Sequence, residues 1–313
     1  MHRDKMRPVQ THKLGRIDNM TFTDFIATLV NGISLGGIYA MIALGYTMVY
    51  GIAKMLNFAH GDIIMVGGYT IYVTMSLLGH PLLAVFTAVI ICTVLGIVIE
   101  KVAYKPLRGA SPLAVLITAI GVSYLLQSLA QIVFGSAPKM VRIFDKLGSV
   151  QVGDLKLQTA TLVTLGSTVV LMTVLTLFIK YTKVGRAMIA VSEDRDTAQL
   201  MGINVNRIIT VTFSIGSALA ALAGLFLLMR APNVSSTLGA MPGIKAFTAA
   251  VIGGIGSIPG AMLGGVLLGI VECIANKITV LAPYTDAIEF SILIIILLVR
   301  PNGFLGKKKR EKV

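Results

Sequence analysis

The sequence has few of the charged residues that a water-soluble domain needs to cover its surface. Asp, Glu, Lys and Arg make up only 13% of its 313 residues, and 55% are hydrophobic, whereas soluble domains contain about 25% charged residues. Its apolar runs are close to the ~20 residues that cross ~30 Å of hydrocarbon as a helix. This composition excludes a soluble globular domain and predicts an all-α, polytopic transmembrane helical bundle.

Tryptophan is absent, and there are only two cysteines, Cys92 and Cys273. Without tryptophan, an aromatic belt at the membrane surface must consist of Tyr and Phe. Both cysteines lie inside apolar runs, with neither the spacing of a disulfide framework nor that of metal ligands. We interpret them as small buried hydrophobic residues and predict no metal site.

The sequence contains no nucleotide-binding GxxxxGK[ST] loop, so we expect the chain to bind no nucleotide and no other cofactor. Its net charge of +13 could suggest nucleic acid as a partner. However, the basic residues lie in the tails and short connections, and no basic surface alternates with aromatic residues. The charge therefore predicts contact with anionic membrane lipid and no binding of nucleic acid.

Hydrophobic patterning divides the chain into a basic N-terminal tail (1–23), a transmembrane domain (24–300) and a basic C-terminal tail (301–313). Lys and Arg in 101–108, in 181–207 and in the C-terminal tail place these segments in the cytoplasm, and 136–160 outside. We expect eight spans, at 24–50, 62–78, 82–103, 113–135, 161–180, 208–229, 245–276 and 285–300.

These spans conflict with the sidedness of the basic segments. Five spans separate the N-terminal tail from 181–207, and three separate that loop from the C-terminal tail. Both numbers are odd, so both tails would face outward. A periplasmic N-terminus would explain the number of spans before 181–207, but not the position of the C-terminal tail. We therefore expect an additional crossing or re-entrant piece in each of the glycine-broken segments 24–78 and 245–276, giving up to ten crossings.

A polar stretch, NFAHGD at 57–62, lies between two long apolar runs. In one interpretation it is a short cytoplasmic turn, in which Asn57 or Asp62 caps the next helix. In the other a helix breaks within the membrane, and Asn57, His60 and Asp62 line a cavity. The pattern alone leaves both interpretations open.

A second stretch, about 30 residues long from Ala246 onward, is too long and too glycine-rich for one uninterrupted helix. It predicts a re-entrant turn or two short helices meeting head to tail. Glu272 lies deep in this apolar run, either hydrogen-bonded for structural reasons or active in a pathway or gate. The residues expected to break or pack these helices are Gly253, Gly254, Gly256, Pro259, Gly260 and Gly264.

The third stretch, 185–207, is an extended polar segment between apolar spans. We predict a short helix at about 193–201, capped by Ser192, with Glu193 and Asp194 in its first turn. Gly202 fits the position after the helix end, with Ile203 as its hydrophobic contact. A short ordered helix in a cytoplasmic loop is typical of a surface that docks on a partner.

Five stretches together resemble the LivH-type (BraD-type) permease family of high-affinity branched-chain amino-acid ABC importers. They are YTMVYG (46–51), NFAHGD (57–62), VAYKPLR (102–108), GRAMIAVSEDRDTAQLMGIN (185–204) and KAFTAAVIGGIGSIPGAMLGG (245–265). The similarity extends from about residue 25 to the C-terminus.

The resemblance implies a non-catalytic translocation subunit for leucine, isoleucine and valine in the bacterial inner membrane. Its implied partners are a second, LivM-like permease, two cytoplasmic LivG/LivF-like ATPases that hold ATP and Mg, and a periplasmic amino-acid-binding protein. An ABC permease for another small solute, or an ion-coupled secondary transporter, remains the alternative.

The resemblance also suggests roles for individual residues. It makes 181–207 the cytoplasmic coupling loop, and it favours a helix break at the pathway or its gate for NFAHGD. The coupling-interface candidates are Gly185, Arg186, Glu193, Asp194, Ala198, Leu200, Gly202 and Ile203. The pathway or gate candidates are Asn57, His60, Asp62 and Glu272.

Overall fold

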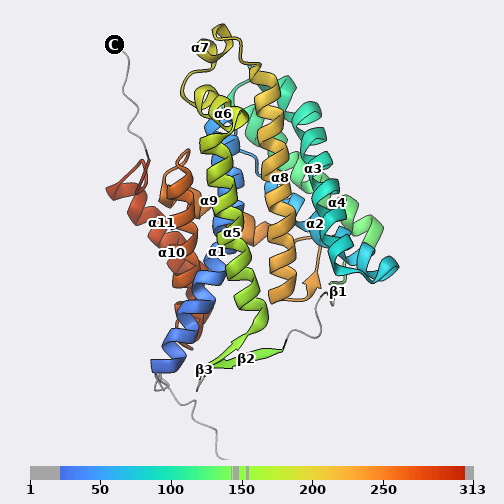
Figure 1. Ribbon diagram of the computed structural model, residues 1–313, viewed down its shortest axis with the longest axis vertical. Coiled ribbons are helices and arrows are strands. Elements are labelled where there is room, and N and C mark those ends of the chain that lie inside the picture. Colours follow the sequence, from blue (N-terminus) through green and yellow to red (C-terminus); the bar gives the residue numbers. More distant parts are fainter. Residues whose placement is uncertain (1–21, 142, 144–147, 153–154, 307–313) are drawn as a thin grey trace, which may run out of the picture.

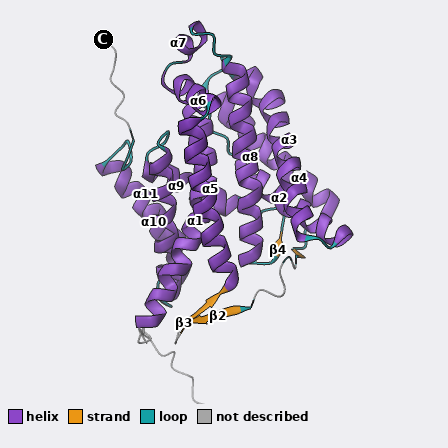
Figure 2. Cartoon of the chain, in the orientation of Figure 1, coloured by secondary structure: helices purple, strands orange, loops and turns teal. Residues whose placement is uncertain are grey.

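The computed structural model describes residues 22–141, 143, 148–152 and 155–306. Most of the two predicted basic tails, residues 1–21 and 307–313, therefore lies outside the described residues. The described chain is a bundle of long helices standing side by side (Figure 1), and its few strands are short (Figure 2). The predicted all-α class is confirmed.

Eight helical segments are long and apolar enough to cross a membrane, as predicted. They are α1 (Phe22–Ala53), α2 (His60–Leu78), α3 (Pro81–Ile99, extended by a π-helical turn Glu100–Tyr104 and a 3-10 turn Lys105–Leu107), α4 (Pro112–Phe134), α5 (Thr159–Tyr181), α8 (Val205–Arg230), α10 (Ile258–Lys277) and α11 (Thr285–Val299, preceded by a 3-10 turn Ala282–Tyr284). The shorter helices are α6 (Lys183–Glu193), α7 (Arg195–Leu200) and α9 (Ala240–Gly253).

Two short antiparallel pairings lie at the end of the bundle opposite α6 and α7 (Figure 1). β1 (Lys139–Met140) pairs with β4 (Asn233–Val234), placing Lys139 opposite Val234. β2 (Ser149–Val152) and β3 (Leu155–Gln158) form a hairpin. We refer to these two ends of the bundle as the strand end and the α6/α7 end.

The positions of the helix ends resolve the conflict in the number of crossings. α1 begins at the strand end (Figure 1), so α1 to α5 make five crossings before α6. After α8, the segment 231–253 crosses as the short strand β4, a run of turns at 236–239 and α9. The Ile252 carbonyl accepts a hydrogen bond from the Phe304 N–H at 2.9 Å. With α10 and α11, the described chain makes nine crossings.

The additional crossing that we expected in 245–276 is therefore present. The one that we expected in 24–78 is absent, so that part of the prediction is wrong. The glycine-rich stretch around 245–276 does contain a broken helix pair. The segment 24–78 contains only α1 and α2, and α1 runs unbroken for 32 residues. The glycines of α1 permit close helix packing, because a Cβ added at Gly36 would lie 2.6 Å from the Val266 Cα of α10.

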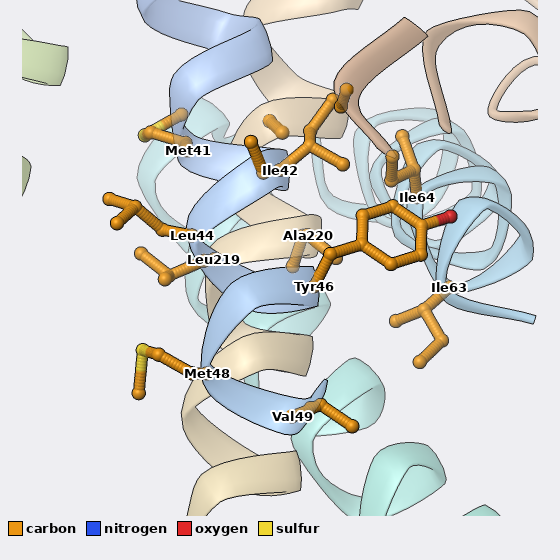
Figure 3. Close-up of a cluster of buried hydrophobic side chains, with 14 of the residues drawn as sticks. Met41, Ile42, Leu44, Tyr46, Met48, Val49, Ile63, Ile64, Leu219 and Ala220 are labelled. Atoms are coloured by element: carbon orange, nitrogen blue, oxygen red, sulfur yellow. The ribbon is translucent and has the colours of Figure 1, made fainter. Parts of the chain in front are cut away.

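α1 lies at the centre of the bundle and is buried along most of its length. Close backbone contact with α10 is reciprocal, since a Cβ added at Gly265 would lie 2.5 Å from the Ala40 Cα. Figure 3 shows side chains of α1 directed toward different neighbours, with the Tyr46 ring beside Ile63 and Ile64 of α2. This packing holds the break between α1 and α2 inside the protein.

Candidate functional site

The break between α1 and α2 is buried, not a turn in water. Asn57, His60 and Asp62 are 2%, 1% and 3% exposed. α2 begins at His60 without a side-chain cap, so neither Asn57 nor Asp62 has the capping role proposed for them. The interpretation in which Asn57 or Asp62 caps α2 is therefore wrong, because the segment after Ala53 turns back into the bundle and α2 starts in its interior.

The three polar residues of this break contact three different neighbours. The Tyr104 hydroxyl donates to Asn57 Oδ1 at 2.8 Å, and Gln127 Nε2 of α4 donates to Asp62 Oδ1 at 2.8 Å. The His60 ring meets the Tyr46 ring edge-on, with centroids 4.8 Å apart, and its Nε2 lies against Gly45 without a hydrogen-bond partner. The residues are close in sequence but do not converge on a single ligand.

The beginnings of α2 and α9 meet in the interior of the bundle. A Cβ added at Gly61 would lie 2.5 Å from the Gly239 carbonyl oxygen, and one at Gly243 would lie 3.2 Å from the Gly61 Cα. Only glycines allow two backbones to approach this closely. The two irregular segments therefore support each other, which satisfies the requirement that non-helical backbone at membrane depth be buried in protein.

The second predicted break joins α9 to α10. Gly254 and Gly256 of the turn have φ values of 105° and 94°, a region that favours glycine. Ser257 caps α10 by accepting the Gly260 N–H at 3.2 Å. Pro259 lies in the first turn of α10, and Gly253, Gly260 and Gly264 form close α9–α10 contacts. The expected break is confirmed, but only α9 is short, because α10 has 20 residues and is long enough to cross a membrane.

Glu272 lies in an ionic cluster, buried except for Asp286, that we call the Lys245 cluster: Tyr39, Lys245, Glu272, Asp286 and Glu289. Lys245 Nζ lies 3.1 Å from Glu272, 2.9 Å from Asp286 and 3.3 Å from Glu289. The Tyr39 hydroxyl donates to Glu272 at 2.6 Å. These contacts link α1, α9, α10 and α11, and they support the structural interpretation of Glu272.

Sequence reasoning did not find the partners of Glu272. Lys245 was part of a recognised stretch, but nothing in the pattern joined it to Glu272, 27 positions away. Glu289 is fully buried in α11. The available signal was the presence of Lys245 and Glu289 themselves within apolar runs, where charged residues pair with one another.

The short helix of the 185–207 segment begins later than predicted. Residues 183–193 form α6, and Asp194, not Ser192, caps α7 by accepting the N–H groups of Asp196 at 3.0 Å and Thr197 at 3.1 Å. Glu193 therefore belongs to α6. The predicted end is confirmed, because Gly202 has φ of 82° and the Ile203 N–H donates to the Ala198 carbonyl at 3.0 Å.

The predicted coupling residues differ in their exposure. Leu200 is 87% exposed and Met201 is 78% exposed. Met201 was not among the predicted coupling residues. Glu193, Arg186 and Gly202 are also exposed. In contrast, Gly185 packs against Ile179, Ala198 is buried, and Ile203 is half-buried against the core. The surface available to a partner is therefore the apolar tip formed by Leu200 and Met201.

Two side chains tie α7 and the end of α6 to the end of α1. Arg195 donates to the Ile52 carbonyl from Nε at 3.1 Å and Nη2 at 2.7 Å, and Lys54 Nζ donates to the Ser192 carbonyl at 3.1 Å. Burial, together with the charge of Arg108, lowers the pKa of Arg195 from its ordinary value. We call this pair of contacts the α1–α7 clamp; it links α7, and through Ser192 the end of α6, to the segment that leads into Asn57 and His60.

A cavity of about 670 Å³ lies beside the clamp. The end of α1, α5, α6 and the α9–α10 turn form its walls, with Met48, Ile52, Met188, Ile189 and Ile258 among the apolar lining and Ser192 and Ser257 among the polar residues. The clamp, the cavity and the two broken segments thus adjoin at the α6/α7 end.

A family model described as "Branched-chain amino acid transport system / permease component" matches residues 28–297. The chain belongs to this family. The permease is 42% identical over 307 residues to the permease protein LivH of Escherichia coli K12, covering 93% of this chain and 99% of the relative. It is 44% identical to BraD of Pseudomonas aeruginosa over 302 residues, covering 92% and 98%.

A weaker similarity reaches a sugar transporter. The ribose import permease RbsC of Haemophilus influenzae is 30% identical over 137 residues, which is 42% of each chain. Family membership and the eight apolar spans make this chain a multi-pass membrane protein and a permease component of a transport system, which works with partner subunits.

Proposed function

We propose that this permease is the translocation subunit of an ATP-driven importer that moves leucine, isoleucine and valine across the bacterial inner membrane. The observation that carries the proposal is the similarity along nearly the full chain to LivH and BraD, both named as high-affinity branched-chain amino-acid transport permeases. The match to the ribose permease covers less than half of the chain and supports the alternative substrate less well.

The proposed partners are a second, LivM-like permease, two LivG/LivF-like ATPases and a periplasmic amino-acid-binding protein. The ATPases would hold ATP and Mg, consistent with a sequence that has no GxxxxGK[ST] loop. The basic residues of 181–207 place the α6/α7 end in the cytoplasm. There the exposed apolar tip, Leu200 and Met201, provides a surface that fits a groove on an ATPase.

In this mechanism, movement of the ATPases displaces α7, and the α1–α7 clamp transmits the displacement to the end of α1. The charged side chains of Arg195 and Lys54 each hold a backbone carbonyl of the other segment, a geometry stronger than a neutral hydrogen bond. The break at 54–59 then moves with α7. Selectivity lies mainly in the binding protein, because tight binding in the permease would trap the amino acid.

Energy coupling tests the proposed function as a whole. The complex with both permeases and both ATPases is reconstituted in liposomes, and uptake of radiolabelled leucine is measured with and without ATP in the presence of the binding protein. We expect ATP-dependent uptake that isoleucine and valine inhibit and ribose does not. Accumulation of leucine driven by a proton or sodium gradient alone, without ATP, would contradict the proposal.

The docking surface is tested by Leu200→Asp and Met201→Asp. Both side chains are exposed and not needed for the fold, so we expect normal membrane levels but loss of ATPase association by at least tenfold, about 1.4 kcal/mol. Gly202→Asp is less suitable, because the φ of 82° strains any other residue. Val280→Asp, at an exposed apolar residue at the strand end, is the matched control and should retain the ATPases.

The clamp is tested by Arg195→Met, which keeps much of the side-chain length but removes the donors. We expect the ATPases to stay bound while the number of leucine molecules imported per ATP falls. Arg207→Met, at an exposed arginine near the beginning of α8, is the control. Unchanged coupling in Arg195→Met would remove the clamp from the mechanism and leave the docking surface in place.

A further inference from the structure

α4, like α11, has few buried residues. Val115, Ala119 and Ala130 are its buried residues, and its outward face is apolar. Yet one stripe carries Ser123, Gln127 and Gln131, spaced four residues apart and therefore on one face of the helix. Lipid does not need polar side chains, so this stripe serves contacts within the protein or a polar solute.

The polar stripe of α4 faces the two broken segments. Gln127 Nε2 donates to Asp62 at 2.8 Å and lies 3.2 Å from Ser123 Oγ, while Gln131 Nε2 donates to Ser236 at 3.2 Å. Ser236 lies just before the Gly239 contact with Gly61. The stripe thus follows the line along which α2 and the 231–239 stretch run through the interior.

Asp62 is a buried carboxylate without a cationic partner. It is 3% exposed, and among the described residues no Lys, Arg or His lies within ion-pair distance of it. Its side-chain partners, the Gln127 amide and the Ser123 hydroxyl, are neutral. A carboxylate placed in this way within a membrane protein is energetically costly, which makes it a candidate for contact with a transported group.

A second buried group continues this line toward the strand end. Tyr69 lies two helical turns after Asp62, and its ring stacks on Phe134 of α4 with centroids 4.2 Å apart and planes 9° apart. Its hydroxyl is buried and has no hydrogen-bond partner. We call this line the α2–α4 seam; it comprises Asp62, Tyr69, Ser123, Gln127, Gln131, Phe134 and Ser236.

We propose that the α2–α4 seam is a wall of the route taken by the amino acid, and that Asp62 and Gln127 receive its ammonium group. This inference rests on the proposed function. An ammonium group is a donor that suits a carboxylate, and the Gln127 side-chain oxygen adds a second acceptor. Tyr69 and Phe134 offer an apolar surface to the branched side chain of leucine, isoleucine or valine.

The energetics favour exchange at this site. The Asp62–Gln127 bond joins a carboxylate to a neutral amide, so it can open when a substrate ammonium, a charged donor, replaces the amide. An ion pair buried like that of Lys245 and Glu272 would resist such exchange, because separation leaves an uncompensated charge. The sparse packing of α4 allows it to separate from α2 while the amino acid passes.

Cysteine accessibility tests the seam in the reconstituted complex with its partner permease, ATPases and binding protein. In the parent protein the half-buried Cys273 is replaced by Ser. Gln127→Cys and Ser123→Cys are then compared with Leu125→Cys, a control on the outward face of the same helix, where Leu125 is 57% exposed. The probes are membrane-impermeant methanethiosulfonates, one cationic and one neutral, applied during ATP-driven uptake. Uptake by the Cys273→Ser parent tests the proposed function separately.

We expect the probes to modify Gln127→Cys and Ser123→Cys during turnover, and to modify them more slowly when leucine is in excess. Leu125→Cys should stay unmodified. The cationic probe should react about fivefold faster than the neutral one, because two unit charges 4 Å apart in water attract each other by ~1 kcal/mol. Asp62→Asn should abolish this preference. Reaction at Leu125→Cys alone would place the route on the outward face. No reaction at any position in an active complex would make the seam structural. Either result overturns the inference.

Discussion

Asp62 and Glu272 are both carboxylates inside an apolar bundle, but their surroundings differ. Glu272 lies 3.1 Å from Lys245 Nζ and accepts the Tyr39 hydroxyl, within a cluster that joins four helices. Asp62 faces only neutral donors from α4, the Gln127 amide and the Ser123 hydroxyl, on a sparsely packed helix. The comparison teaches that burial alone does not identify a functional acid in a membrane protein; the charge of its partner is more informative.

The difference also concerns what each acid holds in place. The Lys245 cluster connects α9, α10 and α11 to the central α1, so its contacts support the broken helix pair. The Asp62–Gln127 bond connects α2 to one peripheral helix. We therefore expect changes in the Lys245 cluster to affect assembly, and changes at Asp62 to affect transport by assembled protein.

The largest effect is expected for Lys245→Met. Removal of the cation leaves Glu272 and Glu289 buried without compensation, which costs about 3–5 kcal/mol when one partner of a buried pair is lost. The amount of monodisperse protein after detergent extraction and its unfolding temperature should both fall. Adding Glu272→Gln and Glu289→Gln to Lys245→Met should restore part of the loss; a stable Lys245→Met protein would show that the cluster does not support the fold.

The next prediction compares Glu272 and Asp62 directly. Glu272→Gln should lower the free energy of unfolding by about 1.5–3 kcal/mol, the range for hydrogen bonds to charged groups, while uptake per assembled complex stays close to that of the parent. Asp62→Asn should change stability less but reduce the maximal uptake rate. Leucine uptake in proteoliposomes and thermal unfolding measure both quantities. The reverse assignment of the two effects would refute the comparison.

A smaller effect is expected for Tyr39→Phe, which removes the hydroxyl that donates to Glu272 at 2.6 Å but keeps the ring. Because Lys245 still compensates the carboxylate, the loss should be about 1.5 kcal/mol, the lower value for a hydrogen bond to a charged group. Tyr69→Phe is the matched control, since its buried hydroxyl has no hydrogen-bond partner. Equal unfolding temperatures for the two variants would argue against a contribution from the Tyr39–Glu272 bond.

The smallest effect belongs to Asp286→Asn. Its carboxylate lies 2.9 Å from Lys245 Nζ, but the side chain is 55% exposed. Water and salt screen such a pair, so we expect a loss below about 1 kcal/mol. Unfolding at low and high salt should reveal it: the difference between parent and variant should shrink as salt increases. A loss as large as that of Lys245→Met would contradict the view that the buried acids dominate the cluster.

The sequence predicted the elements with strong local signals. Gly254 and Gly256 marked the α9–α10 break, because their φ values of 105° and 94° lie in a region that favours glycine. Gly202 marked the end of α7 for the same reason. The beginning of α7 was misplaced, since both Ser192 and Asp194 are good caps and only the folded α6 decides between them.

Long-range pairing could not be predicted in this way. Asp62 and Gln127 are 65 positions apart, and Tyr39 and Glu272 are 233 positions apart. The glycines of α1 posed a similar problem, because Gly36 can break a helix or pack against a neighbour, and only the presence of α10 showed which. No local pattern contains this information.

By itself, then, the sequence determined the membrane class, the eight apolar spans, the α9–α10 break and the end of α7, because hydrophobic length and glycine backbone freedom act over short stretches of chain. Only the tertiary structure decided the ninth crossing, the clamp between α1 and α7, and the partners of the buried acids. A carboxylate has the same chemistry wherever it occurs in the chain. Whether a lysine or an amide lies beside it depends on how distant helices pack.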